Sequence, residues 1–203
     1  MKQLTALLKL VLLATLLAAC GKTPQVSALG SNDIVLAFGD SLTFGTGAQS
    51  SESYPAQLGV AINRKVVNAG VPGEISAAGL ERLPALLDEV QPKLLILCHG
   101  GNDFLRKLDD NATQANLRAM ITLAKQKRID VVLMATPKPG LTVSTPAFYA
   151  EIAKEFALPF SGDVLGSVLR DNNLKSDLIH PNAKGYALIA DTLAKLLKKA
   201  GAV

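Results

Sequence analysis

Apolar runs alternate with stretches of helical periodicity along most of this 203-residue chain, and this alternation restricts its fold more than any other feature. Runs rich in Val, Ile and Leu predict strands at 34–38, 65–68, 93–98, 130–135 and 158–160. Apolar residues three or four positions apart predict helices over 55–63, 76–90, 112–127, 146–156 and 182–198, with a kink or break at Pro84. Such alternation is typical of a mostly parallel sheet covered by helices on both faces, a three-layer α/β sandwich.

A Gly39-Asp40-Ser41 turn directly follows the first predicted strand. Ligands bind at the carboxyl edge of open α/β sheets, so this turn places a hydroxyl where chemistry occurs. A serine hydroxyl is a weak nucleophile until a base takes its proton, and His180 is the candidate base because imidazole titrates near neutrality. Asp177, three residues earlier, can turn back to the other ring nitrogen. The sequence thus predicts a Ser-His-Asp triad.

Acyl transfer also needs hydrogen-bond donors aimed at the oxyanion that develops on the substrate. The candidate donors are the backbone N–H groups of Ser41 and Gly70 and the side-chain amide of Asn102, since all three follow predicted strands. Tyr54 and Phe104 are candidates for lining the substrate groove, with simple core packing as the alternative for both.

Four short blocks resemble those of the GDSL, or SGNH, hydrolases in order and spacing: Gly39–Leu42, Asn68–Gly70, Gly100–Asp103 and Asp177–His180. Within that family the similarity is to the periplasmic acyl-CoA thioesterase, lysophospholipase and arylesterase group, over about residues 33–198. The resemblance implies a five-stranded, flavodoxin-like sheet and hydrolysis of carboxylic esters or thioesters through an acyl-enzyme, with no metal or cofactor. It implies these roles: nucleophile Ser41, base His180, orienting acid Asp177, and an oxyanion hole of Ser41, Gly70 and Asn102.

Two segments depart from the thioesterase pattern and leave the substrate open. The stretch 71–76 carries a proline and Glu74, and the stretch 137–142 is proline-rich and lacks the expected arginine. Because both should border the acyl or leaving-group site, the substrate preference of that group does not carry over to this chain. A carbohydrate O-acetyl esterase is an alternative to the lipase-like activity, since the same residues serve that reaction. A surface lipoprotein that acts mainly by binding is a further alternative.

The first twenty residues are typical of a bacterial lipoprotein leader. Two lysines precede an apolar stretch over 10–19, which is too short to span a bilayer, and Leu17-Ala18-Ala19-Cys20 resembles a lipobox. The resemblance implies cleavage before Cys20 and lipid on that residue, and Gly21 favours the outer membrane, facing the periplasm or the surface. We therefore expect a signal peptide over 1–19, a lipidated tether over 20–30 and one hydrolase domain over 31–203.

Composition narrows the possible partners. Half of the net charge of +4 comes from Lys2 and Lys9 in the leader, so the domain lacks the basic character of a nucleic-acid-binding protein. Two cysteines and two histidines make no zinc cluster, and no metal or cofactor is expected. Cys98 should be buried in a strand, and His99 should have a structural or hydrogen-bonding role. The expected partners are a small acyl substrate and the membrane, with the chain a monomer.

Overall fold

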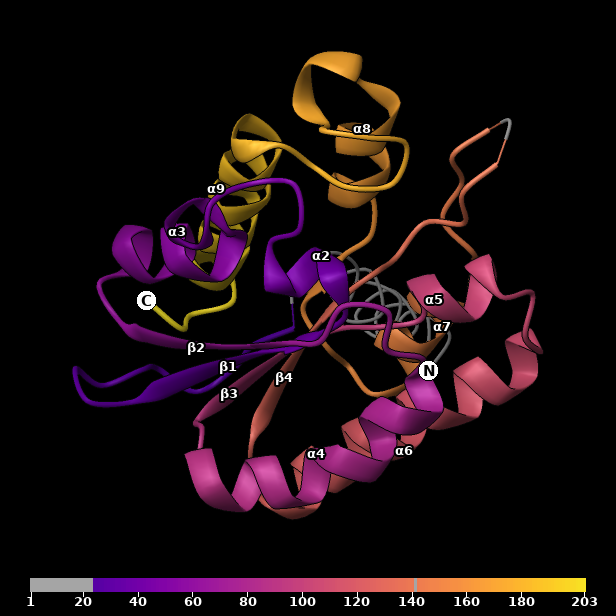
Figure 1. The fold of residues 1–203 in the computed structure, drawn as a ribbon. Coiled ribbons are helices and arrows are strands. Elements are labelled where there is room, and N and C mark those ends of the chain that lie inside the picture. Colours follow the sequence, from indigo (N-terminus) through magenta and orange to yellow (C-terminus); the bar gives the residue numbers. More distant parts are fainter. Residues whose placement is uncertain (1–23, 141) are drawn as a thin grey trace, which may run out of the picture.

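The computed structural model describes residues 24–140 and 142–203, which form one sheet flanked by helices (Figure 1). The strands are β1 (Ile34–Gly39), β2 (Lys65–Gly70), β3 (Leu94–Cys98), β4 (Asp130–Met134) and β5 (Phe160–Ser161). They lie in the order β2-β1-β3-β4-β5, and every neighbouring pair is parallel. This confirms the predicted five-stranded α/β fold.

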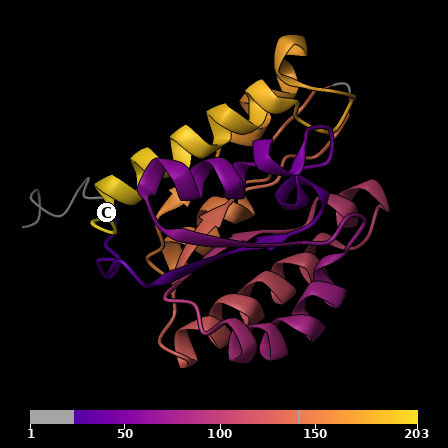
Figure 2. The ribbon, with the colours of Figure 1, turned by 60° about the vertical axis from the view of Figure 1, so that its left-hand side comes forward.

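Helices cover both faces of the sheet. They are α2 (Ser41–Phe44), α3 (Tyr54–Ile62), α4 (Ser76–Val90), α5 (Gly101–Leu105), α6 (Asp110–Gln126), α7 (Phe148–Glu155), α8 (Val164–Arg170) and α9 (Ala183–Lys199). Side chains of α3, α8 and α9 join one buried cluster against the sheet, and those of α4, α6 and α7 join the other. Figures 1 and 2 show the sheet between these two helical layers.

The central strand β1 shows why the sheet needs both layers. Val35 and Ala37 point into one core, whereas Leu36 and Phe38 point into the other, and all four are fully buried. Strands that are apolar on both sides in this way are expected when helices cover both faces.

Three details differ from the sequence-based expectations. Helix α4 runs unbroken through Pro84, so no split occurs there. The short helices α2, α5 and α8 were not predicted, because segments of four, five and seven residues hold too few turns for a clear helical period. The last strand is Phe160–Ser161 rather than 158–160.

The end of the expected tether is part of the folded domain. The N–H groups of Val26 and Leu29 donate to the carbonyls of Ala200 and Ala202 at 3.0 and 2.8 Å, and Leu29 is buried in the core. The signal peptide and Cys20 lie outside the described residues. Within residues 24–140 and 142–203, every helix is too short or too polar to be a bilayer-spanning segment.

The strand order positions the site. The chain passes from β1 to β2 on one side of β1 and later to β3 on its other side, so the direction of winding reverses between β1 and β3. Crevices form at the carboxyl ends of strands at such switch points. Ser41 and Asn102 follow β1 and β3, so both lie at this crevice.

Candidate active site

Ser41 is the first residue of α2, held in place by the Asp40 side chain. One Asp40 carboxylate oxygen accepts the N–H of Leu42 at 3.0 Å, which caps α2, and the other accepts the Asn102 amide Nδ2 at 3.2 Å. Asp40 is buried, and this burial raises the pKa of its carboxyl group. Asp40 therefore links the serine turn to the Asn102 turn.

The structure brings together the three side chains of the predicted triad. His180 Nε2 lies 3.0 Å from Ser41 Oγ, and His180 Nδ1 lies 2.8 Å from Asp177 Oδ2. Because a carboxylate only accepts, Nδ1 carries the proton and Nε2 is free to accept the serine hydroxyl hydrogen. The structure thus brings together two positions 139 residues apart in the chain.

Asp177 is fixed as an anion. Its Oδ1 accepts the N–H groups of Ile179 and His180, both at 2.8 Å. Burial alone would raise the pKa of Asp177, but the hydrogen bonds from the His180 ring and from these two amides outweigh it and lower the pKa. The negative charge that orients the imidazole is therefore maintained at neutral pH.

The segment that carries His180 is held by hydrogen bonds of the residues before and after it. Ser176 donates its N–H to the carbonyl of His180 at 2.9 Å, and Asn182 caps α9 by accepting the N–H of Gly185 at 3.1 Å. Gly47, with a φ of 99°, lies so close that a Cβ there would overlap Ser176 Oγ and the carbonyl of Pro181. The loop after α2 and the histidine loop therefore fit together only with glycine at position 47.

In the described part of the chain, two of the three predicted oxyanion donors have an N–H group that is free to bind a substrate oxygen. The Ser41 N–H has no acceptor among the described residues, as expected for a first helical residue. The Asn102 amide uses one N–H for Asp40 and keeps a second.

The Gly70 N–H is engaged, which corrects the third prediction. It donates to Asn68 Oδ1 at 3.0 Å, and a Cβ on Gly70 would overlap the backbone at Phe44. Glycine is needed here because α2 packs on it, not because substrate approaches. Gly73, with a φ of 77°, has an N–H without an acceptor in the described chain and is the remaining backbone candidate beside β2.

Tyr54 and Phe104, the two candidates for lining the substrate groove, lie in different surroundings. Tyr54 is fully buried, and its hydroxyl lies 3.1 Å from the Thr43 hydroxyl, so it packs in the core and does not line the groove. Phe104 packs against Phe148 and Tyr149, and its remaining surface borders a groove beside the site.

A small cavity opens at Ser41 and continues into that groove. The cavity, about 30 Å³, is lined by Ser41, Asn102 and His180 and by the apolar side chains Leu42 and Leu105. The groove, about 810 Å³, shares five wall residues with the cavity: Leu105, Pro137, Pro139, Leu169 and Ile179. In the part of the loop after β4 that the structure describes, Pro137, Pro139, Gly140 and Thr142 therefore border the site or the groove, as expected for this segment.

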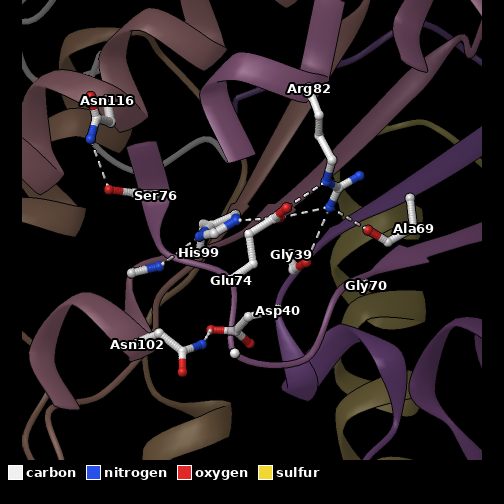
Figure 3. Close-up of polar contacts among 12 residues, drawn as sticks. Gly39, Asp40, Ala69, Gly70, Glu74, Ser76, Arg82, His99, Asn102 and Asn116 are labelled. Carbon is white, nitrogen blue, oxygen red and sulfur yellow. Dashed lines mark hydrogen bonds and ion pairs between the residues drawn. The ribbon is translucent and has the colours of Figure 1, made fainter. Parts of the chain in front are cut away.

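A buried ionic cluster behind the site was not predicted. Glu74 Oε1 accepts Arg82 Nε at 2.7 Å, and its Oε2 lies 3.0 Å from His99 Nε2 (Figure 3). Burial would raise the pKa of Glu74, but the hydrogen bonds from His99 and Arg82, together with the positive charge of Arg82, lower it to about 2. The only sequence signal was an acid in a loop that departs from the thioesterase pattern.

No set of three His, Cys, Asp or Glu side chains within the described ranges is arranged to hold a metal ion. Cys98 is a buried free thiol, as predicted, and burial raises its pKa far above the usual range.

Several known bacterial proteins are similar to this chain in sequence or in fold. The chain is 35% identical over 174 residues to thioesterase 1/protease 1/lysophospholipase L1 of Escherichia coli K12, covering 82% of this chain and 84% of that protein. It is 31% identical to esterase TesA of Pseudomonas aeruginosa over 91% and 98% of the two chains. The crystal structure of the psychrotrophic esterase EstA from Pseudoalteromonas sp., inhibited by monoethylphosphonate, superposes with a TM-score of 0.73 at 26% identity, covering 83% of this chain and 98% of EstA.

Residues 37–188 match the GDSL-like Lipase/Acylhydrolase family. This range contains all four sequence blocks and both halves of the Ser41–His180 contact. The chain therefore belongs to the GDSL-like lipase/acylhydrolase family.

Proposed function

We propose that this protein is a serine esterase that hydrolyses carboxylic ester or thioester bonds through an acyl-enzyme intermediate. One observation carries the proposal: an unbroken hydrogen-bonded chain runs from Asp177 through His180 to Ser41, with steps of 2.8 and 3.0 Å. Nucleophile, base and orienting acid are thus within the distances that proton transfer requires.

In the first step, Ser41 Oγ attacks the substrate carbonyl carbon while His180 Nε2 takes the hydroxyl proton. Asp177 stabilises the imidazolium that forms. The carbonyl oxygen becomes an oxyanion, for which the Ser41 N–H and the free N–H of the Asn102 amide are the proposed donors, with Gly73 as the candidate third. Each such donor is worth about 10²–10³ in rate.

The tetrahedral intermediate then collapses. The bond to the leaving alcohol or thiol breaks, and His180 gives that group its proton, leaving an acyl ester on Ser41. Water then enters, and its oxygen bonds to the acyl carbon while His180 takes one of its protons. The bond from the acyl carbon to Ser41 Oγ breaks, His180 gives its proton to that oxygen, and the carboxylic acid leaves. Departure of the leaving group and hydrolysis of the acyl-enzyme thus use the same three side chains as the first step.

The test is turnover of p-nitrophenyl acyl esters by wild type and Ser41→Ala, with fluorophosphonate labelling and peptide mass spectrometry. We expect the variant to lose turnover, and wild type to carry the adduct on Ser41. Full turnover by Ser41→Ala would overturn the mechanism. Absence of an adduct on folded wild type would favour the alternative of a lipoprotein that acts mainly by binding.

The apolar groove beside Ser41 favours an acyl chain longer than acetate. Its walls include Phe104, Leu105, Val143, Leu169 and Ile179, which can bury methylene groups. A series of p-nitrophenyl esters from acetate to laurate measures this preference through kcat/KM. A steep preference for acetate would reject it and favour the carbohydrate O-acetyl esterase.

We further propose that the mature chain is anchored in the cell envelope by lipid on Cys20, at the outer membrane, and acts as a monomer. The support is the leader sequence and the lipobox-like Leu17–Cys20. Detergent partitioning and membrane fractionation of wild type and Cys20→Ser, with size-exclusion chromatography, test this. A soluble wild-type protein that fractionates like the variant would contradict the anchor.

A further inference from the structure

The ionic cluster behind the site joins the strand ends that carry the reacting groups. Arg82 Nη2 donates to the carbonyl of Ala69 at 2.8 Å and to that of Gly39 at 3.5 Å (Figure 3). Gly39 and Ala69 lie at the carboxyl ends of β1 and β2, and His99 directly follows β3. The Glu74 carboxylate, through its two partners, therefore contacts the ends of all three strands.

The hydrogen bonds of His99 define which of its ring nitrogens carries the proton. The N–H of Gly100 donates to His99 Nδ1 at 3.2 Å, so Nδ1 is an acceptor and the proton lies on Nε2, facing Glu74. The ring fits because α4 has glycine at position 79, where a Cβ would overlap Nε2. His99 thus transmits the position of Glu74 to the Gly100-Gly101-Asn102 turn.

The loop that bears Glu74 is also hydrogen-bonded to the end of β1 and to the residue after α5. The N–H of Val71 donates to the carbonyl of Gly39 at 3.0 Å, and Arg106 Nη2, just past α5, donates to the carbonyl of Gly73 at 2.8 Å. Glu74 is the ionic group of this loop, and its side chain is 7% exposed. A buried carboxylate without its partners is costly, so its geometry is strongly enforced.

We propose that Glu74 is a positioning residue for the reaction of Ser41. Its carboxylate holds the ends of β1 and β3 at the separation at which the Ser41 N–H and the Asn102 amide reach one carbonyl oxygen. Glu74 touches neither substrate nor the triad. This inference rests on the proposed esterase function and adds a residue to it that acts through Asn102.

The test measures kcat and KM of Glu74→Gln on a p-nitrophenyl ester, with active sites counted by fluorophosphonate titration. We expect kcat per titrated site to fall about 10- to 100-fold with KM changed less than about threefold, because alignment matters mainly in the transition state. His99→Leu should lower kcat about tenfold, and His99→Gln, which keeps an N–H donor, should restore most of it. Glu155→Gln, which breaks the exposed pair with Arg118, is the matched control and should leave kcat unchanged.

A double-mutant cycle with Asn102→Ala separates positioning from simple stability. If Glu74 acts through Asn102, Glu74→Gln should cost much less in the Asn102→Ala background than in wild type. Equal costs in both backgrounds, or an unchanged kcat per titrated site in Glu74→Gln, would overturn the inference. Loss of turnover in Ser41→Ala beside an unaffected Glu74→Gln would leave the esterase function intact and refute only the role of Glu74.

Discussion

Replacing Glu74 by Gln should make the protein less stable at neutral pH and should remove part of its sensitivity to acid. The Glu74 pKa is lowered from 4.5 to about 2, and its side chain is 7% exposed, so solvent screens the cluster little. A carboxyl group whose pKa is lowered by folding stabilises the folded state above its unfolded pKa and loses this contribution as the pH falls through its folded pKa. At about 1.36 kcal/mol per pKa unit, the contribution is about 3 kcal/mol near neutrality.

The assay is urea unfolding of wild type and Glu74→Gln, followed by circular dichroism at about pH 6 and about pH 3. The difference in unfolding free energy should be about 3 kcal/mol at the higher pH and about 1 kcal/mol at the lower one. Asp88→Asn is the control, since Asp88 pairs with Lys127 at the surface and its side chain is 68% exposed. A wild-type minus Glu74→Gln difference that stays constant across this pH range would refute the reasoning.

Three further substitutions probe the site. Asp177→Asn removes the acceptor that fixes the His180 tautomer and should lower kcat by about 10²-fold or more, measured by steady-state kinetics; a change in KM alone would contradict it. Asn102→Ala should lower kcat by about 10²–10³ with little change in ester binding, and an unchanged kcat would remove Asn102 from the oxyanion hole. Gly47→Ala should overlap Ser176 and displace the histidine loop, so the rate of phosphonylation at Ser41 should fall; an unaltered rate would show that the loop adapts.

Much of the fold and the triad followed from local sequence signals. The central strands β1 and β3 are continuous apolar runs because both faces of the sheet are covered there, and this pattern is visible residue by residue. Asp177 and His180 are three positions apart, so their contact forms within one turn. Ser41 could be placed beside Asp177 and His180 because the carboxyl ends of parallel strands meet at a common edge of the sheet.

The parts that sequence could not supply depend on how individual side chains turn and pack in the folded chain. Whether Tyr54 packs or lines the groove is decided by the Thr43 hydroxyl beside it in the core. The Gly70 N–H is engaged because the Asn68 side chain turns back toward it, and many rotamers of Asn68 would not do so. The contact of Glu74 with His99 spans 25 residues and also requires a glycine at position 79, which no local pattern reveals.

A crystal structure of the protein with a monoalkyl phosphonate bound covalently to Ser41 would test the proposed catalysis as a whole. The account predicts a phosphonyl oxygen about 3 Å from both the Ser41 N and the Asn102 Nδ2, with His180 still hydrogen-bonded to Asp177. A phosphonyl oxygen that points away from both donors, or phosphorus bound to a residue other than Ser41, would contradict it.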